Sequence, residues 1–217
     1  VLGWPAQTVT HAYSSPGSCE VPVSVVRSTC QQALTTTIEV KDVVVPLTLS
    51  AAGTGSGGVV GAPNSINCTI TGGSSSGTCS DFVLLGSVHT LTATPAADFV
   101  FDSWTNCSNP ASNVCQQTVT ADTTVTANFL ELFTLTVIVD TGAGNPSVVS
   151  DIGGINCLEG ETCTAQFPSG TVVQLTAIEA GGALFSQWSN CVSPNSSSKT
   201  INVTMNADKT CNTSFVN

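Results

Sequence analysis

The chain has 217 residues, and only 8% of them are charged: 14 acidic residues stand against four basic ones, for a net charge of −10 at pH 7. So acidic a chain repels phosphate backbones and anionic lipid surfaces, which argues against nucleic-acid partners and membrane-surface binding. No apolar run is long enough to span a membrane, and the length allows two modest domains, each with its own core.

An N-terminal arm, residues 1–46, comes first. It contains a small cysteine loop from Cys19 to Cys30 and then a β-branched run that ends at Pro46. Such a run predicts a strong β-strand. An arm of this size buries little core by itself, so we expect it to pack on the following domain or on a neighbouring subunit. The residues expected to form an assembly strand are Thr35, Thr37, Ile38, Val40, Val43, Val44 and Val45.

Further strands are predicted where apolar residues alternate with Thr-rich polar positions. These runs cover residues 47–50, 88–94, 119–129, 135–140, 172–178 and 201–205. Turns are predicted at clusters of Gly, Ser, Asn and Pro in residues 53–61, 72–77, 141–146, 153–154 and 193–198. No long window has helical periodicity. The predicted fold is all-β and antiparallel, because strands this close in sequence are most easily joined by hairpins.

An internal repeat organises the rest of the chain: residues 47–129 recur in diverged form as residues 135–215. The recurring positions are core, turn and cysteine positions, without any cluster of acids, bases or ligands. We therefore expect two modules, repeat 1 (residues 47–130) and repeat 2 (residues 131–217), after the arm. The matching motifs are Ile66-Asn67-Cys68 with Ile155-Asn156-Cys157, Leu91-Thr92-Ala93 with Leu175-Thr176-Ala177, Asn106-Cys107 with Asn190-Cys191, and Ala121-Asp122 with Ala207-Asp208.

The ten cysteines point to an oxidising compartment. None of them form a Cys-x-x-Cys pair, and the two histidines, His11 and His89, lie far from any metal-ligand spacing. Disulfides are therefore expected, and neither a metal nor a cofactor is. The chain opens on Val1 without a signal peptide, so we expect a processed secreted form or an internal fragment.

Each copy also contains Phe-x-x-Trp, as Phe101 to Trp104 and Phe185 to Trp188, and ends in Ala-Asp-x-Thr followed by Phe. Together with the motifs above, this order resembles the divergent internalin-type B-repeat of bacterial cell-surface and secreted proteins, over about residues 47–217. The resemblance implies small β-rich modules with structural, adhesive or spacer roles and no catalytic residues. We expect the Phe and Trp residues to anchor the two cores; an exposed aromatic platform for sugar is the alternative.

Alignment of the two copies assigns the cysteine pairs. Cys68–Cys79 and Cys157–Cys163 occupy matching places, and Cys107 would join Cys115 across a short turn. Repeat 2 has Ile201 at the place of Cys115, but it has Cys211 where repeat 1 has Val125, so Cys191–Cys211 is expected. Cys19–Cys30 completes the set, and free cysteines are the alternative.

Two possible sites are set aside. The run Gly53 to Gly58 has the spelling of a dinucleotide loop, but no helix follows it to present amides to a phosphate. His89 could be grouped with Asp81 or Asp98, yet no nucleophile motif accompanies them, and repeat 2 has Val173 at the place of His89. We therefore expect no catalytic residues.

Calcium and glycans are the remaining ligands considered. Asp140, Asn145 and Asp151 could offer oxygens to calcium, but they lack the spacing of a calcium loop, and polar turn chemistry explains them better. Possible N-glycosylation sequons occur at Asn67, Asn106, Asn195, Asn202 and Asn212.

The sequence thus favours a non-catalytic extracellular structural protein of the cell surface or a secreted fibre. The leading hypothesis is a filament subunit that polymerises with copies of itself, because a strand of the arm could complete a sheet in the next subunit. The alternative is an adhesive or spacer module of a larger surface protein, with a host surface or polysaccharide as a candidate partner.

Overall fold

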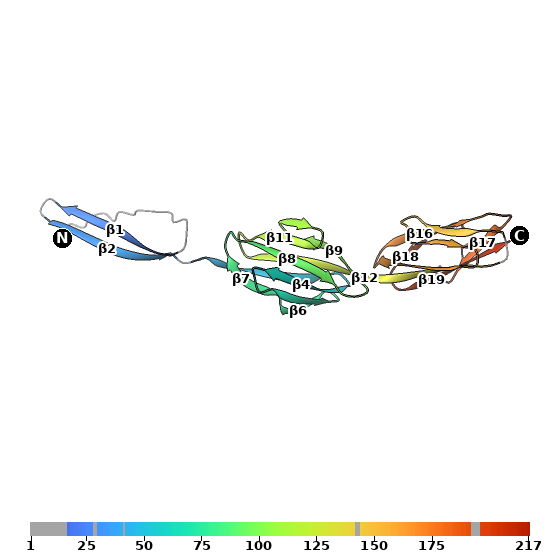
Figure 1. Ribbon diagram of the computed structural model, residues 1–217, viewed down its shortest axis with the longest axis horizontal. Coiled ribbons are helices and arrows are strands. Elements are labelled where there is room, and N and C mark those ends of the chain that lie inside the picture. The colour runs from blue at the N-terminus through green and yellow to red at the C-terminus, as the bar shows by residue number, and fades with distance from the viewer. Residues whose placement is uncertain (1–16, 28–29, 41, 142–143, 192–195) are drawn as a thin grey trace.

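The protein is described here from a computed structural model that covers residues 17–27, 30–40, 42–141, 144–191 and 196–217, with the backbone alone in the first two ranges. These residues form strands, turns and bends without a helix, which confirms the all-β prediction. Figure 1 shows the two repeats arranged end to end along the long axis of the molecule.

The arm forms a hairpin of β1 (Gly17–Arg27) and β2 (Cys30–Val40), which make a separate two-stranded antiparallel sheet. The expected single strand is thus divided between β2 and the start of the next strand at Val44. In the hairpin register, Cys19 lies opposite Ile38 and Cys30 opposite Arg27. At about 3.3 Å per residue the two cysteines are roughly 26 Å apart. The predicted Cys19–Cys30 disulfide therefore requires another arrangement of the arm.

Repeat 1 consists of two β-layers. One layer has the strand order β7-β3-β12-β9 and the other β10-β11-β8-β4-β5-β6. Apolar side chains alternate inward from both layers, so the core lies between them. The strands are β3 (Val44–Ala52), β4 (Ser56–Ala62), β5 (Asn67–Thr71), β6 (Ser74–Thr78), β7 (Ser80–Leu84), β8 (Val88–Pro95), β9 (Phe99–Thr105), β10 (Asn109–Ala111), β11 (Val114–Thr118) and β12 (Thr123–Val139).

Repeat 2 has the same plan with fewer strands. Its layers have the orders β15-β12-β19-β17 and β14-β13-β16-β18, and its core again lies between them. Each of its strands has a counterpart in repeat 1. The strands are β13 (Ser147–Ser150), β14 (Asn156–Leu158), β15 (Thr162–Pro168), β16 (Val172–Ile178), β17 (Leu184–Ser189), β18 (Thr200–Thr204) and β19 (Lys209–Val216).

Strand β12 belongs to both repeats. Its first half pairs with β3 and β9 of repeat 1, and its second half pairs with β15 and β19 of repeat 2. It is therefore the last strand of one sandwich and the first strand of the next. The sequence predicted two strands here, residues 119–129 and 135–140, and the expected boundary between residues 130 and 131 falls inside β12.

Two strand pairs depart from the antiparallel prediction. β3 pairs with β12 in parallel, with Leu47 opposite Thr123, and β12 pairs with β19 in parallel, with Leu135 opposite Lys209. The prediction assumed hairpins between neighbouring strands. These pairs instead join the first and last strands of a repeat, and the whole repeat forms the long connection that parallel pairing needs.

The two cores share a three-ring arrangement. In repeat 1, Phe101 lies 5.2 Å from Trp104 and 5.5 Å from Phe129 between ring centroids. In repeat 2, the corresponding distances from Phe185 to its Trp and Phe neighbours are both 5.7 Å. Trp188 is fully buried and its indole N–H donates to the Ser198 carbonyl at 3.0 Å. These rings serve the cores, as expected, and do not form an exposed sugar platform.

Four disulfides are present among the described residues, and they are the four pairings expected there from the repeat. Three of them connect the two layers of a sandwich. The fourth fastens the segment after β17 to β19 within one layer. The pairs are Cys68–Cys79, Cys107–Cys115, Cys157–Cys163 and Cys191–Cys211.

The glycine-rich run was predicted as a turn, and this prediction is wrong for its second half, which forms β4. Glycine is needed here because β4 approaches β12 closely. A Cβ atom on Gly57 would lie 2.5 Å from the ring of Phe129, whereas one on Gly58 would meet its nearest atom at 3.8 Å. The glycines of this run thus allow close packing of β4 against β12. The run leads into a strand, whereas a dinucleotide-binding loop would need a helix there. The turn predicted at residues 72–77 is also partly replaced by a strand, β6.

Replacing Gly57 by Ala should destabilise the protein by about 1–3 kcal/mol, because the added methyl overpacks the contact with Phe129. The matched control, Gly58→Ala in the same strand, should change the free energy of unfolding by less than about 0.5 kcal/mol. Urea unfolding followed by tryptophan fluorescence measures both. Equal effects of the two variants would contradict the packing role of Gly57.

Candidate functional site

The junction between the repeats is formed along β12. The Leu132 amide donates to the Asp98 carbonyl of repeat 1 at 2.9 Å, and the Ser169 amide of repeat 2 donates to the Glu131 carbonyl at 2.7 Å. Neighbouring residues of one strand are therefore hydrogen-bonded to different repeats. Because successive backbone groups point to opposite edges of a strand, both edges of β12 stay paired as the partners change.

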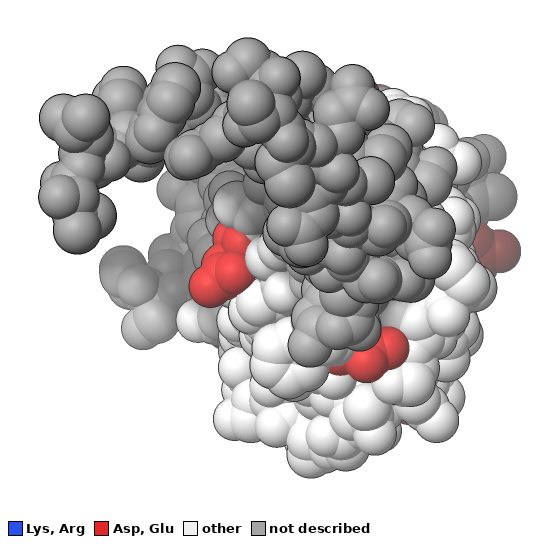
Figure 2. Space-filling model, turned by 90° about the vertical axis from the view of Figure 1, so that its left-hand side faces the viewer, with Lys and Arg blue, Asp and Glu red and all other residues white. Residues whose placement is uncertain are grey.

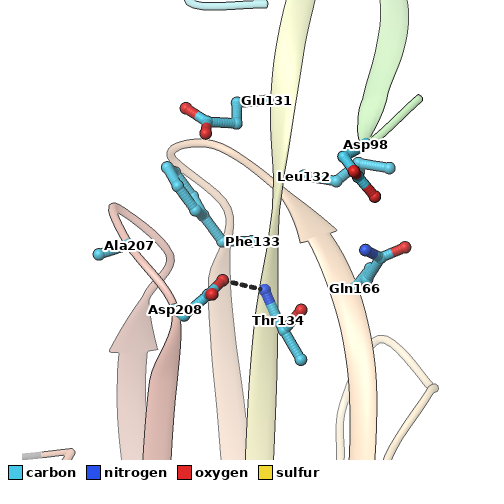
Figure 3. A pocket seen from close by; sticks show the side chains of 8 residues that line it. All are labelled: Asp98, Glu131, Leu132, Phe133, Thr134, Gln166, Ala207 and Asp208. Carbon is cyan, nitrogen blue, oxygen red and sulfur yellow. Dashed lines mark hydrogen bonds between the residues drawn. The ribbon is translucent and has the colours of Figure 1, made fainter. Parts of the chain in front are cut away.

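A pocket of about 400 Å³ lies at this junction (Figure 3). It is lined by the turn before β9, by β12, by β15 and by the turn before β19, so both repeats contribute to it. Three of the residues that line the pocket are acidic: Asp98, Glu131 and Asp208. No lining residue is basic. The three carboxylates do not come close enough together to form a metal-ligand group among the described residues.

Asp208 has a structural role in this pocket. Its Oδ1 atom accepts a hydrogen bond from the Thr134 amide at 2.8 Å, as the dashed line in Figure 3 shows. The carboxylate thereby fixes the turn before β19 to the start of repeat 2. In repeat 1 the counterparts are Asp122 and Pro46, and proline has no N–H to donate.

Removing the Asp208 carboxylate as Asp208→Ala should therefore cost about 0.5–1.5 kcal/mol of unfolding free energy, the range of one solvent-exposed hydrogen bond. Asp122→Ala is the matched control, and its effect should stay within about 0.5 kcal/mol because its counterpart position offers no donor. Thermal unfolding by calorimetry measures both. An equal loss in the two variants would contradict the role of the Thr134 amide.

One group of potential metal ligands occurs in the described part of the chain: Cys157, Glu161 and Cys163. The two sulfurs are joined in a disulfide and so are not thiolate ligands. Glu161 accepts a hydrogen bond from the Leu158 amide at 3.0 Å, which closes the turn between β14 and β15. This group is thus part of the turn. Of the residues considered for calcium, Asp151 accepts a hydrogen bond from the Gln174 amide at 2.9 Å.

His89 is buried in β8, and its Nε2 atom lies 2.7 Å from the Ser87 hydroxyl. The Ser87 hydroxyl donates its single proton to the Leu84 carbonyl at 2.5 Å, so His89 must donate to Ser87 in this arrangement. The imidazole then does not act as a base toward this serine. Asp81 does not orient the ring either, because it accepts a hydrogen bond from the Ser65 amide, and His89 Nδ1 has no partner. The geometry does not form a nucleophilic triad.

Burial lowers the pKa of His89 below its usual value of 6.5, and the charge of Asp81 opposes this only in part. Since the folded state then binds the proton more weakly than the unfolded chain, protonation favours unfolding. The resulting loss of stability begins as the pH falls through about 6.5 and is absent above it.

The variant His89→Val, which installs the residue that repeat 2 has at this place, should therefore flatten the stability profile between pH 7.5 and 5.5. Chemical unfolding at several pH values in that window measures the slope. As a control, Val88→His places an imidazole at an exposed position of the same strand and should leave the slope as in the parent chain. A parent-like slope in His89→Val would show that another group titrates.

The sequons fall in different surroundings. Asn67, Asn106 and Asn202 are exposed, whereas Asn212 lies in the paired strand β19 with its side-chain oxygen buried. Asn195 lies outside the described residues. Access for a glycan is therefore better at the first three positions, and their modification stays a prediction.

The sequence reasoning missed the junction. A signal was present, since residues 130–134 join two predicted strands and contain no Gly, Pro, Asn or Asp to form a turn. Glu131 and Leu132 belong to a strand that does not end there.

The fold and the junction together define a class of protein: tandem β-sandwich repeats that share a strand and contain disulfides within each repeat. The chain belongs to the divergent InlB B-repeat domain family, which matches residues 64–131 and 148–217. This confirms the resemblance inferred from the motifs. No curated protein gives a significant match to the chain. Among the described residues, no helical segment has the length and hydrophobicity required to traverse a bilayer.

Proposed function

We propose that this chain is a non-catalytic, extracellular spacer segment of a longer cell-surface protein. The observation that supports this best is the continuous strand β12, which joins the two repeats without a flexible linker. Its 17 residues extend for about 56 Å at 3.3 Å per residue. Two sandwiches that share such a strand hold their ends at a set separation, which is what a spacer requires.

The chemistry of the chain agrees with an extracellular setting. Disulfides persist in oxidising compartments, and four link the described residues. Four basic residues in the whole chain leave few sites for trypsin-like proteases. The surface repeats of the same family provide the expectation of a cell-surface location.

A rigid spacer should lose its set length when β12 is interrupted. Insertion of Gly-Ser-Gly-Ser between Glu131 and Leu132 should broaden the distribution of interatomic distances measured by small-angle X-ray scattering. The same insertion between Gly72 and Gly73, in an exposed turn of repeat 1, is the control and should leave the distribution as in the parent chain. If the first insertion gives the same scattering as the control, the rigid-spacer proposal fails.

A binding measurement distinguishes an adhesive role of the same repeats from the spacer role. The spacer proposal predicts that the intact chain retains no polysaccharide on a glycan array. Specific retention of a glycan would favour adhesion.

The filament hypothesis is the second candidate. The observation that favours it is the hairpin of the arm, in which β2 pairs with β1 on one edge and keeps its other edge unpaired among the described strands. Such an edge could add to the sheet of another subunit. Electron microscopy and light scattering of the full chain and of a variant lacking residues 1–46 test this. Filaments that form only with the arm would support it.

A further inference from the structure

An apolar surface lies at the N-terminal end of repeat 1, where β3 begins and β7 ends. Val44 pairs with Leu84, Pro46 with Phe82, and the Leu85 amide donates to the Val43 carbonyl at 2.8 Å. We call it the repeat 1 end surface and define it by its large exposed side chains. They are Val43, Val44, Phe82, Leu84 and Leu85, with exposures of 59%, 50%, 71%, 46% and 47%.

Repeat 1 covers most of the corresponding surface of repeat 2, although Gln166, at the place of Phe82, stays exposed. In the matching register, Leu132 pairs with Pro168 as Val44 pairs with Leu84. Leu132, Pro168 and Ser169 are half-buried, because the turn at Asp98 lies against the start of repeat 2 and bonds to the Leu132 amide. The repeat 1 end surface therefore lacks the neighbour that repeat 2 has.

The arm has short motifs that also occur at the end of repeat 1. Cys19-Glu20-Val21-Pro22 matches Cys107-Ser108-Asn109-Pro110, at an offset of 107−19 = 88. Cys30-Gln31-Gln32 matches Cys115-Gln116-Gln117, at an offset of 115−30 = 85. Thr36-Thr37-Ile38 matches Thr123-Thr124-Val125, at an offset of 123−36 = 87, which puts Ile38 and Val40 at the places of the buried Val125 and Ala127. These motifs occur in the same order as β10, β11 and β12 of repeat 1, and they lead into β3 as the first half of β12 leads into repeat 2.

We propose that residues 19–46 are the terminal strands of a further repeat of the same kind, and that the repeat 1 end surface is the docking surface for that repeat. This deepens the proposed spacer function and rests on it, since it makes the chain part of a longer array. The occupant is a B-repeat joined through a strand that continues into β3, as repeat 1 is joined to repeat 2 through β12.

The chemistry of the surface fits this occupant. Its five side chains are all apolar, so a neighbouring repeat can cover them without removing a charge from water. Figure 2 shows this end of the molecule. The described atoms visible there are mostly uncharged, with separate acidic residues and no Lys or Arg. Covering the surface would bury apolar area that is otherwise in contact with water.

The unaltered chain offers a first measurement. Counterparts of Cys19 and Cys30 in repeat 1, Cys107 and Cys115, form a disulfide. Peptide mapping of the non-reduced 217-residue chain should therefore find Cys19 bonded to Cys30. The β1–β2 register keeps these residues apart, so free thiols or bonds to other cysteines would support that hairpin and overturn the proposal.

The second measurement completes the repeat. In a three-repeat chain, residues 47–106 are placed directly before Cys19 in place of residues 1–18, and the added copy carries Phe82→Leu so that the original peptide with Leu84 has a unique mass. Hydroxyl-radical labelling should modify Leu84, whose counterpart Pro168 is half-buried, several-fold less in this chain than in the 217-residue chain. Exposed Leu158, in repeat 2, is the internal control and should react equally in both.

Leu85→Asp is the matched variant. Because Leu85 is exposed in the 217-residue chain, the substitution should leave the melting temperature of that chain unchanged. In the three-repeat chain it should restore the labelling of Leu84. A protease-resistant added segment with unprotected Leu84 would overturn the docking surface, and a protease-sensitive segment would overturn the assignment of residues 19–46. Protection of Leu84 that appears in the 217-residue chain only at high concentration would identify a second copy as the occupant. None of these outcomes alters the scattering test of the spacer, so the two proposals can fail separately.

Discussion

The backbone hydrogen bonds of β12 are the interaction on which the rest of the structure depends. A strand with an unpaired edge attracts other strands, and a buried backbone group without a partner is costly. At the junction both edges of β12 are paired, because the Leu132 amide donates to repeat 1 and the Glu131 carbonyl accepts from repeat 2. The two sandwiches therefore meet without a linker, and their separation follows from the rise per residue of an extended chain.

Parallel pairing of the first and last strands makes this junction possible. Within a repeat, β3 and β12 run in the same direction, and so do β12 and β19. The chain consequently leaves a repeat in the direction in which it entered, and the last strand can continue as the first strand of the next repeat. An antiparallel pair would return the chain to its starting end and would require a turn at every junction.

The sequence predicted what depends on local pattern and on comparison of the two copies. Alternating apolar residues located β3, β8, β12, β16 and β18 but not the other strands of the two repeats, and matched positions paired eight cysteines, including the displaced bridge from Cys191 to Cys211. What it could not supply depends on distant contacts. Gly57 was assigned to a turn because glycine usually marks one, yet it lies in a strand because of the ring of Phe129. The parallel pairs and the pocket at Asp208 likewise arise between residues far apart in sequence.

Comparison of the two copies shows which residues differ between the repeats and which structural groups recur. His89 in repeat 1 stands where repeat 2 has the buried Val173, and the sandwich accommodates either residue. At the repeat ends, Pro46 in repeat 1 stands where Thr134 donates to Asp208 in repeat 2. The duplication preserves the three-ring cluster and one disulfide between the layers, Cys68–Cys79 in repeat 1 and Cys157–Cys163 in repeat 2. The repeat thus retains groups that fix the geometry of each sandwich, and it varies polar groups such as His89 and Thr134.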